Sequence, residues 1–192
     1  EQLHAGLREA AADPGVRVLV LGHTGGTFCA GADLSEASGG DPFESTAART
    51  RELATVLRAI VESPLPVVAA IDGHVRAGGL GLVGACDIAV AGPRSTFALT
   101  EARIGVAPAI ISLTLLPKLS PRAAARYYLT GETFSAERAA EIGLITLAAE
   151  DVTAAVDGLV ADLGRGSPQG LAASKALTTA SILAGFDRDA GR

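Results

Sequence analysis

The feature that most constrains the fold is a pair of short apolar runs, residues 16–21 and 67–71, each followed by a glycine-rich loop. Neither run alternates between polar and apolar residues, which is typical of strands buried on both faces. Two further runs, residues 87–91 and 96–99, also predict strands. Because helical patterns separate several of these runs, the sequence predicts an α/β fold in which at least the first three strands pair in parallel.

Helical spacing of apolar residues predicts helices over 3–12, 42–62, 80–85, 151–163 and 168–183. Ser-Pro pairs at 120–121 and 167–168 are typical of an N-cap followed by a first-turn proline. Strands become rare after about residue 125. We therefore divide the chain into a core, residues 1–125, and a C-terminal helical region, residues 126–192.

Composition excludes several classes of protein. The chain has 192 residues and a formal net charge of −5, so it lacks the basic stripe of a nucleic-acid-binding protein. Its longest uncharged run, residues 104–117, is too short to span a membrane, which takes about 20 apolar residues. With no recognisable signal peptide, the expectation is a cytoplasmic protein. Because the chain starts with Glu1 and contains no Met, we expect that its native start lies elsewhere.

The two cysteines do not predict a metal site. Cys29 and Cys86 have neither a CxxC partner nor a nearby His, and both lie in apolar stretches. The simplest interpretation is that both are buried, reduced thiols.

Two glycine-rich loops are candidates for a functional site: residues 22–27, which lead into the segment 28–34, and residues 72–79. Ligands of open α/β sheets bind beyond the carboxyl ends of the strands, where these loops are expected. If each loop offers one backbone N–H, the pair can bracket a carbonyl oxygen as an oxyanion hole. The alternative, that the glycines only permit tight turns, remains open at this point.

A G-x-G-x-x-G match at residues 79–84 does not indicate a dinucleotide site. That fingerprint directly follows a strand and opens a full crossover helix. Here the match begins well after the strand at 67–71, and only two residues separate it from the next strand.

Glu101 is the candidate acid–base residue. It lies between a strand end and an apolar segment, and a carboxyl group in apolar surroundings can shuttle protons. The alternative is a surface pair with Arg103 or a helix cap. His74 and Arg76 lie in the second loop, where they could face a pocket or solvent. Asp33 and Asp87 are interpreted as residues that brace loops.

Taken together, these segments resemble the crotonase (enoyl-CoA hydratase/isomerase) superfamily. The resemblance is carried by residues 28–34 (FCAGADL), 72–79 (DGHVRAGG), 86–91 (CDIAVA) and 96–105, and extends to 123–126, 129–132 and 139–145. It implies a ββα spiral core followed by a C-terminal helical trimerisation region. Family members normally have roughly 40–60 more N-terminal residues, so the resemblance also implies that opening strands are missing.

The resemblance also implies a site. The backbone N–H groups of Ala32 and Gly78 would be the oxyanion donors, and Glu101 would deliver a proton to the α-carbon of an acyl-CoA thioester. Substrate contacts would come from Ala30, Asp33 and Leu34 as well as from both donors. Coenzyme A would be part of the substrate, with no metal or separate cofactor, and the protein would be a homotrimer or hexamer.

The sequence departs from the family pattern at Gly81, where hydratases carry a second glutamate. Three alternatives follow. In the first, Glu101 alone handles both the water and the α-proton of a hydratase, as in the single-glutamate relatives that the stretch 107–112 resembles. In the second, Glu101 moves a proton between carbons in a Δ3-Δ2-enoyl-CoA isomerase. In the third, the chain is a weakly catalytic or non-catalytic acyl-CoA-binding subunit.

Two basic residues carry further hypotheses. Arg76, if it faces the acyl pocket, could pair with a carboxylate on a dicarboxylic acyl group. Lys175, in the last predicted helix, could contact a coenzyme A phosphate.

Overall fold

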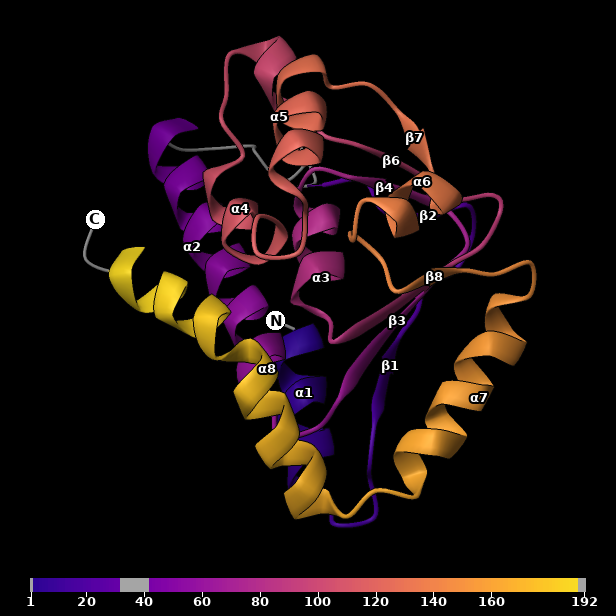
Figure 1. Cartoon of the computed structure of the whole chain (residues 1–192). Helices are drawn as coiled ribbons and strands as arrows, with labels where there is room; N and C mark the ends of the chain where they lie inside the picture. Colours follow the sequence, from indigo (N-terminus) through magenta and orange to yellow (C-terminus); the bar gives the residue numbers. More distant parts are fainter. Residues whose placement is uncertain (1, 32–41, 190–192) are drawn as a thin grey trace.

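The fold is built on two four-stranded sheets, each made of strands from separate parts of the chain (Figure 1). In the computed structural model, residues 2–31 and 42–189 are described. The first sheet has the order β1-β3-β5-β8 and the second β2-β4-β6-β7. The strands are β1 (Leu19–Leu21), β2 (Thr27–Cys29), β3 (Val67–Ile71), β4 (His74–Arg76), β5 (Ile88–Ala91), β6 (Thr96–Ala98), β7 (Phe134–Ser135) and β8 (Leu147–Ala148).

The first turns of the chain each add one strand to each sheet and then a helix, whereas β7 and β8 are separated by α6. The helices are α1 (Gln2–Ala12), α2 (Pro42–Glu62), α3 (Gly78–Ala85), α4 (Ala109–Leu115), α5 (Pro121–Thr130), α6 (Ala136–Glu141), α7 (Val152–Gly164) and α8 (Pro168–Asp189), with a 3₁₀ helix, η2 (Glu101–Ile104). The units β1-β2-α2 and β3-β4-α3 are the repeats of a ββα spiral, as predicted. All pairs in the first sheet are parallel, which confirms the predicted pairing of its first three strands.

Helices cover both faces of the first sheet. Most buried side chains form one cluster between the sheets and helices α2 to α6 and α8, while α7 packs on the opposite face through Val68, Val90 and Val156 (Figure 1). The larger cluster contains residues from both sides of residue 125. The predicted division of the chain there stays a prediction.

Local sequence signals account for several helix ends. The Ser120 hydroxyl accepts from Ala123 N–H and Pro121 occupies the first turn of α5, as predicted, and Gly131 ends that helix with φ 62°. At α8, the Ser167 hydroxyl accepts from Gly170 N–H at 3.1 Å. No helix within residues 2–31 and 42–189 has the length and apolar character needed to cross a membrane.

The predictions erred on short strands. The expected strand over 16–21 pairs only over Leu19–Leu21. The loop predicted over 72–79 contains β4, and α3 begins at Gly78 rather than at residue 80. Strands of three residues are too short to show a periodic pattern, so pairing decides where they form.

Candidate active site

The two glycine-rich loops meet where the sequence places the candidate oxyanion donors. A Cβ atom on Gly31, which has φ 103°, would lie 2.9 Å from Ala77 Cβ, so only glycine permits this approach. Gly31 and Ala77 directly precede the two expected donors, Ala32 and Gly78. Ala32 itself, like Asp33 and Leu34, lies outside the described residues.

Gly78 supplies a backbone N–H at the start of a helix. It is the first residue of α3, and its N–H has no hydrogen-bond partner within the part of the chain that the structure describes. The preceding residue, Ala77, has φ 47° and ψ −125°, a positive-φ conformation that costs an alanine about 1–3 kcal/mol. Such strain is typical of functional sites, and here it marks the turn that starts α3.

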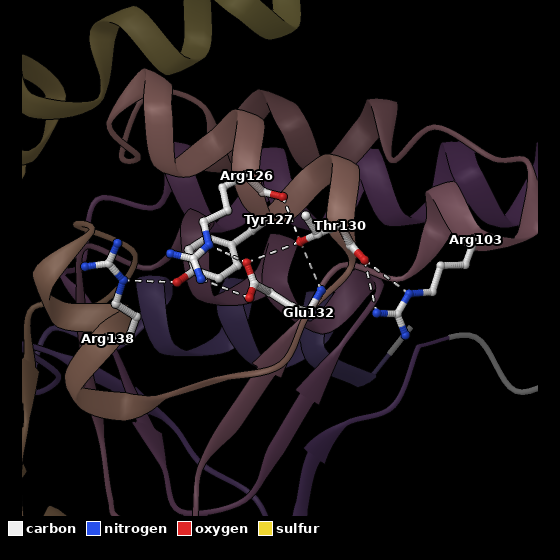
Figure 2. A network of polar contacts seen from close by, with 6 residues as sticks. All are labelled: Arg103, Arg126, Tyr127, Thr130, Glu132 and Arg138. Carbon is white, nitrogen blue, oxygen red and sulfur yellow. Dashed lines mark hydrogen bonds and ion pairs between the residues drawn. The ribbon is translucent and has the colours of Figure 1, made fainter.

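Glu101 opens the 3₁₀ helix η2, which is anchored through Arg103. The Arg103 guanidinium donates to the Thr130 carbonyl at the end of α5, at 3.2 and 3.0 Å (Figure 2). A Cβ atom on Gly131 would lie 2.8 Å from Arg103 Nε, so glycine makes room for this contact. The alternative pairing of Glu101 with Arg103 is therefore not formed, since Arg103 binds to α5.

The end of α5 is itself held by polar contacts (Figure 2). Arg126 forms an ion pair with Glu132, and the Thr130 hydroxyl donates to Arg126 O at 2.8 Å and accepts from Glu132 N–H at 3.3 Å. Arg138 Nε donates to the Tyr127 hydroxyl at 3.0 Å and joins α6 to α5. These contacts give η2 a fixed support.

Glu101 and Gly78 line the same cavity, of about 190 Å³. The other lining residues come from α2 and from the segment around α4: Thr50, Leu53, Ala107, Pro108, Ala109, Ile110 and Ile111. Glu101 Oε2 is buried and has no hydrogen-bond partner within the described residues. An unsatisfied buried carboxylate oxygen costs free energy, which suits a group that binds or exchanges a proton with a ligand.

Other side chains fill the space around Gly81, the position at which the family resemblance leads us to expect a second glutamate. A Cβ atom on Gly81 would lie 2.6 Å from Ile111 Cγ2 and 3.1 Å from Leu57 Cδ1. Gly81 is buried inside α3. The packing thus leaves no room at this position for any side chain, and Glu101 is the only carboxylate among the described residues that line the cavity.

Two predictions need correction. Lys175 is buried rather than available to a phosphate, because its ammonium group pairs with Asp87 at 2.8 Å and donates to Ile60 O and Leu65 O. Cys86 is buried as predicted, but Cys29 is only half-buried.

Other predicted residues are placed as follows. Arg76 donates to Val75 O, Thr96 O and the Thr96 hydroxyl, and it is not among the residues that line the cavity with Glu101. Ala30 is exposed beside Gly31. Asp87 accepts from Val67 N–H at 2.8 Å, so it braces the start of β3 rather than a loop as predicted. Within the described residues, no three His, Cys, Asp or Glu side chains are close enough to bind a metal ion.

Sequence reasoning missed three polar residues near the site. His23 Nε2 accepts from Asp72 N–H at 2.9 Å and so ties the first glycine-rich loop to the second. Ser112 and Tyr128 share a hydrogen bond of 3.0 Å behind the cavity wall. None of these pairs could be read from spacing, because their members lie on different elements.

Comparisons with known proteins identify the family of this chain. The family model "Enoyl-CoA hydratase/isomerase" matches residues 1–182. A Mycobacterium tuberculosis H37Rv protein named "Probable enoyl-CoA hydratase EchA14" is 36% identical over 160 residues, which cover 81% of this chain and 61% of that protein. The chain therefore spans less than two thirds of the length of this relative.

Two crystal structures are similar over nearly the whole chain. One, of an enoyl-CoA hydratase from Mycobacterium avium, has a TM-score of 0.92 and 75% identity and covers 98% of this chain and 72% of that one. Another, of an enoyl-CoA hydratase from Shewanella pealeana, has a TM-score of 0.85 and 31% identity and covers 100% of this chain and 75% of that one. With its ββα spiral and these matches, the chain belongs to the enoyl-CoA hydratase/isomerase family, the crotonase superfamily.

Proposed function

We propose that this chain is the catalytic part of an enoyl-CoA hydratase-type enzyme, a lyase that adds water to a 2-enoyl-CoA thioester. The observation that carries the proposal is the buried, unpartnered Glu101 Oε2 in a cavity that Gly78 also lines. A free N–H and an acid–base group in one small cavity suit a carbonyl compound that gains and loses protons at carbon.

The N–H groups of Gly78 and Ala32 would both donate to the thioester oxygen. They would draw electron density from the conjugated double bond and stabilise the enolate that forms when water attacks. Loss of one such donor typically costs about 2.7–4 kcal/mol of barrier stabilisation. The contact between Gly31 and Ala77 supports this pairing, because each of these residues directly precedes one of the donors.

Glu101 would act first as a base and then as an acid. Its carboxylate takes a proton from water while the water oxygen bonds to C3 of the enoyl group, and the same proton then passes to C2. The product is a 3-hydroxyacyl-CoA, which contains all atoms of the 2-enoyl-CoA and of the added water. Because the packing around Gly81 excludes a second acid there, one carboxyl group handles both proton transfers.

The same proposal covers the substrate arm, assembly and location. Ala30, Asp33 and Leu34 would contact the coenzyme A portion of the substrate, which needs no separate cofactor. Assembly would be a homotrimer or hexamer through the C-terminal helices. Cys29 and Cys86 are both free thiols, which suits a reducing compartment such as the cytoplasm.

An isomerase is the second candidate. A Δ3-Δ2-enoyl-CoA isomerase needs only one acid–base group, which removes a proton from C2 and returns it to C4 or the reverse. The absence of a side chain at Gly81 favours this chemistry as well. A non-catalytic acyl-CoA-binding subunit is the third candidate, and turnover separates it from both enzymes.

The test compares the wild-type protein with Glu101→Gln on two substrates. Product mass after incubation with a 2-enoyl-CoA reports hydration, and conversion of a 3-enoyl-CoA reports isomerisation. General acid–base catalysis contributes about 10²–10⁴-fold, so Glu101→Gln should lower kcat by at least that lower bound.

The exposed Glu150 offers a matched control, and Glu150→Gln should keep full activity. Full activity of Glu101→Gln would show that another residue is the acid. If the wild-type protein turns over neither substrate but binds acyl-CoA, the binding-subunit interpretation replaces the enzymatic one.

A further inference from the structure

One wall of the Glu101 cavity separates it from a second hollow. Residues Ala107, Pro108 and Ala109 line both the Glu101 cavity and a neighbouring apolar hollow of about 420 Å³ between α4 and α5. Ser112 and Tyr128 line this outer hollow. The short segment 107–109 is therefore a partition, with the acid on one side and this pair of hydroxyl groups on the other.

The two hydroxyl groups form a directed chain to the partition. Ser112 Oγ donates its single proton to Pro108 O at 2.7 Å. At the 3.0 Å contact between Ser112 Oγ and the Tyr128 hydroxyl, Tyr128 must then be the donor. The order is Tyr128 O–H to Ser112 O–H to the Pro108 carbonyl, and it connects α5 to the partition through one side chain of α4.

We propose that Tyr128 and Ser112 are a positioning pair, which holds the 107–109 partition in place and so sets the geometry of the acyl group beside Glu101. The inference rests on the proposed function, because the geometry it controls is that of the acyl group in the Glu101 cavity. Neither hydroxyl lines that cavity, so both act through the Pro108 segment.

Burial is the largest cause that raises the pKa of Tyr128 above its ordinary value. The phenol therefore keeps its proton and can donate it to Ser112.

The test is a set of hydroxyl deletions in the full polypeptide, assayed with a short-chain 2-enoyl-CoA and a 3-enoyl-CoA. Tyr128→Phe and Ser112→Ala should each lower kcat by about 3- to 10-fold, the range expected for loss of one neutral hydrogen bond. KM should change less than about twofold, because uniform binding of the coenzyme A arm is unaffected. Since both residues act through one chain, the double variant should be no slower than the slower single variant.

Two controls separate positioning from general stabilisation. Thr179→Val removes a buried hydroxyl that donates to the carbonyl four residues earlier in α8, as that of Ser112 does in α4, and it should leave kcat unchanged even if the melting temperature falls. Ser112→Thr keeps a hydroxyl group and should restore most of the kcat that Ser112→Ala loses.

Multiplicative effects in the double variant, an unchanged kcat in Tyr128→Phe, or an equal loss in Thr179→Val would each overturn the positioning role while leaving the proposed function intact. A wild-type protein that turns over neither substrate would overturn both.

Discussion

At the scale of single residues, Gly81 decides how many acids the site can hold. A Cβ atom there would meet Ile111 and Leu57 at distances too short for a side chain to fit without displacing them. The missing glutamate is thus not an empty position that a substitution could refill, because neighbouring apolar side chains have taken the space. In the proposed site, the packing between α3 and α4, which contact each other extensively, therefore leaves no space for an acid at Gly81.

Gly81→Glu should therefore fail to create a second acid. Even Gly81→Ala forces its Cβ to within 2.6 Å of Ile111 Cγ2, and overpacking of this kind costs about 1–3 kcal/mol. We expect Gly81→Ala to lower the free energy of unfolding by that amount and Gly81→Glu to lower it further, with no gain in kcat. Urea denaturation measures the first effect and the hydratase assay the second.

A matched glycine on a different helix provides the control. A Cβ atom on Gly158, in α7, would have no other atom within 4 Å, so Gly158→Ala should stabilise the protein by about 0.5–1 kcal/mol through helix propensity. If Gly81→Ala were as stable as Gly158→Ala, the packing argument against a second acid would be wrong.

The sequence could identify residues whose local motif is distinctive. Glu101, Gly78 and the glycines of both loops stand in recognisable segments, and the structure brings the described members of this set together. The sequence could not predict the partners of Lys175 or Tyr128. Those partners, Asp87 and Ser112, are brought close by helix packing and not by sequence spacing.

At the scale of elements, the long helices and the strands β3, β5 and β6 were predicted well, while β2 and β4 were missed. The helices over 42–62 and 168–189 carry enough turns for their spacing to show, and Ser-Pro pairs mark two helix starts. Strand β4 has only three residues and exists because β2 and β6 pair with it on either side. Strand β4 ends at Arg76, and α3 begins soon after it at Gly78, which supplies the free N–H, rather than at residue 80 as predicted.

A buried ion pair adds to the attachment of α8, which also packs into the core through Ile182 and Phe186. The side chains of Lys175 and Asp87 are 5% and 15% exposed, and the ammonium group also donates to two carbonyls near the end of α2. Lys175→Met would leave the Asp87 carboxylate buried without its partner. Breaking such a pair costs about 3–5 kcal/mol, and we expect urea denaturation to show a loss of that size.

An exposed ion pair at the end of α7 tests whether burial is the reason for the large effect expected of Lys175→Met. Arg165 and Asp162 form an ion pair with side chains 76% and 66% exposed. Surface pairs contribute about 0–1 kcal/mol, so Arg165→Met should have little effect on the free energy of unfolding. Equal losses in the two variants would contradict the assignment of a special role to the buried pair.

At the scale of the whole molecule, the alkylation rates of the two thiols distinguish the native surface from the opened core. Cys86 lies in the main core, and burial, with a smaller contribution from Asp87, raises the pKa of its thiol from 9.0 to about 12. Cys29, in β2, is only half-buried. Because the thiolate is the reactive form, Cys86 should be alkylated only when the core opens.

We therefore expect iodoacetamide at pH 8 to label Cys29 readily in the native protein and Cys86 far more slowly. When opening and closing are faster than labelling, the Cys86 rate follows the population of the open state. Lys175→Met, at a cost of about 3–5 kcal/mol, should then raise that rate on the order of 10²- to 10³-fold. Mass spectrometry of Cys29→Ser isolates the Cys86 signal. A Cys86 rate that matches Cys29, or one that ignores Lys175→Met, would mean that the core around β5 opens locally, independently of α8.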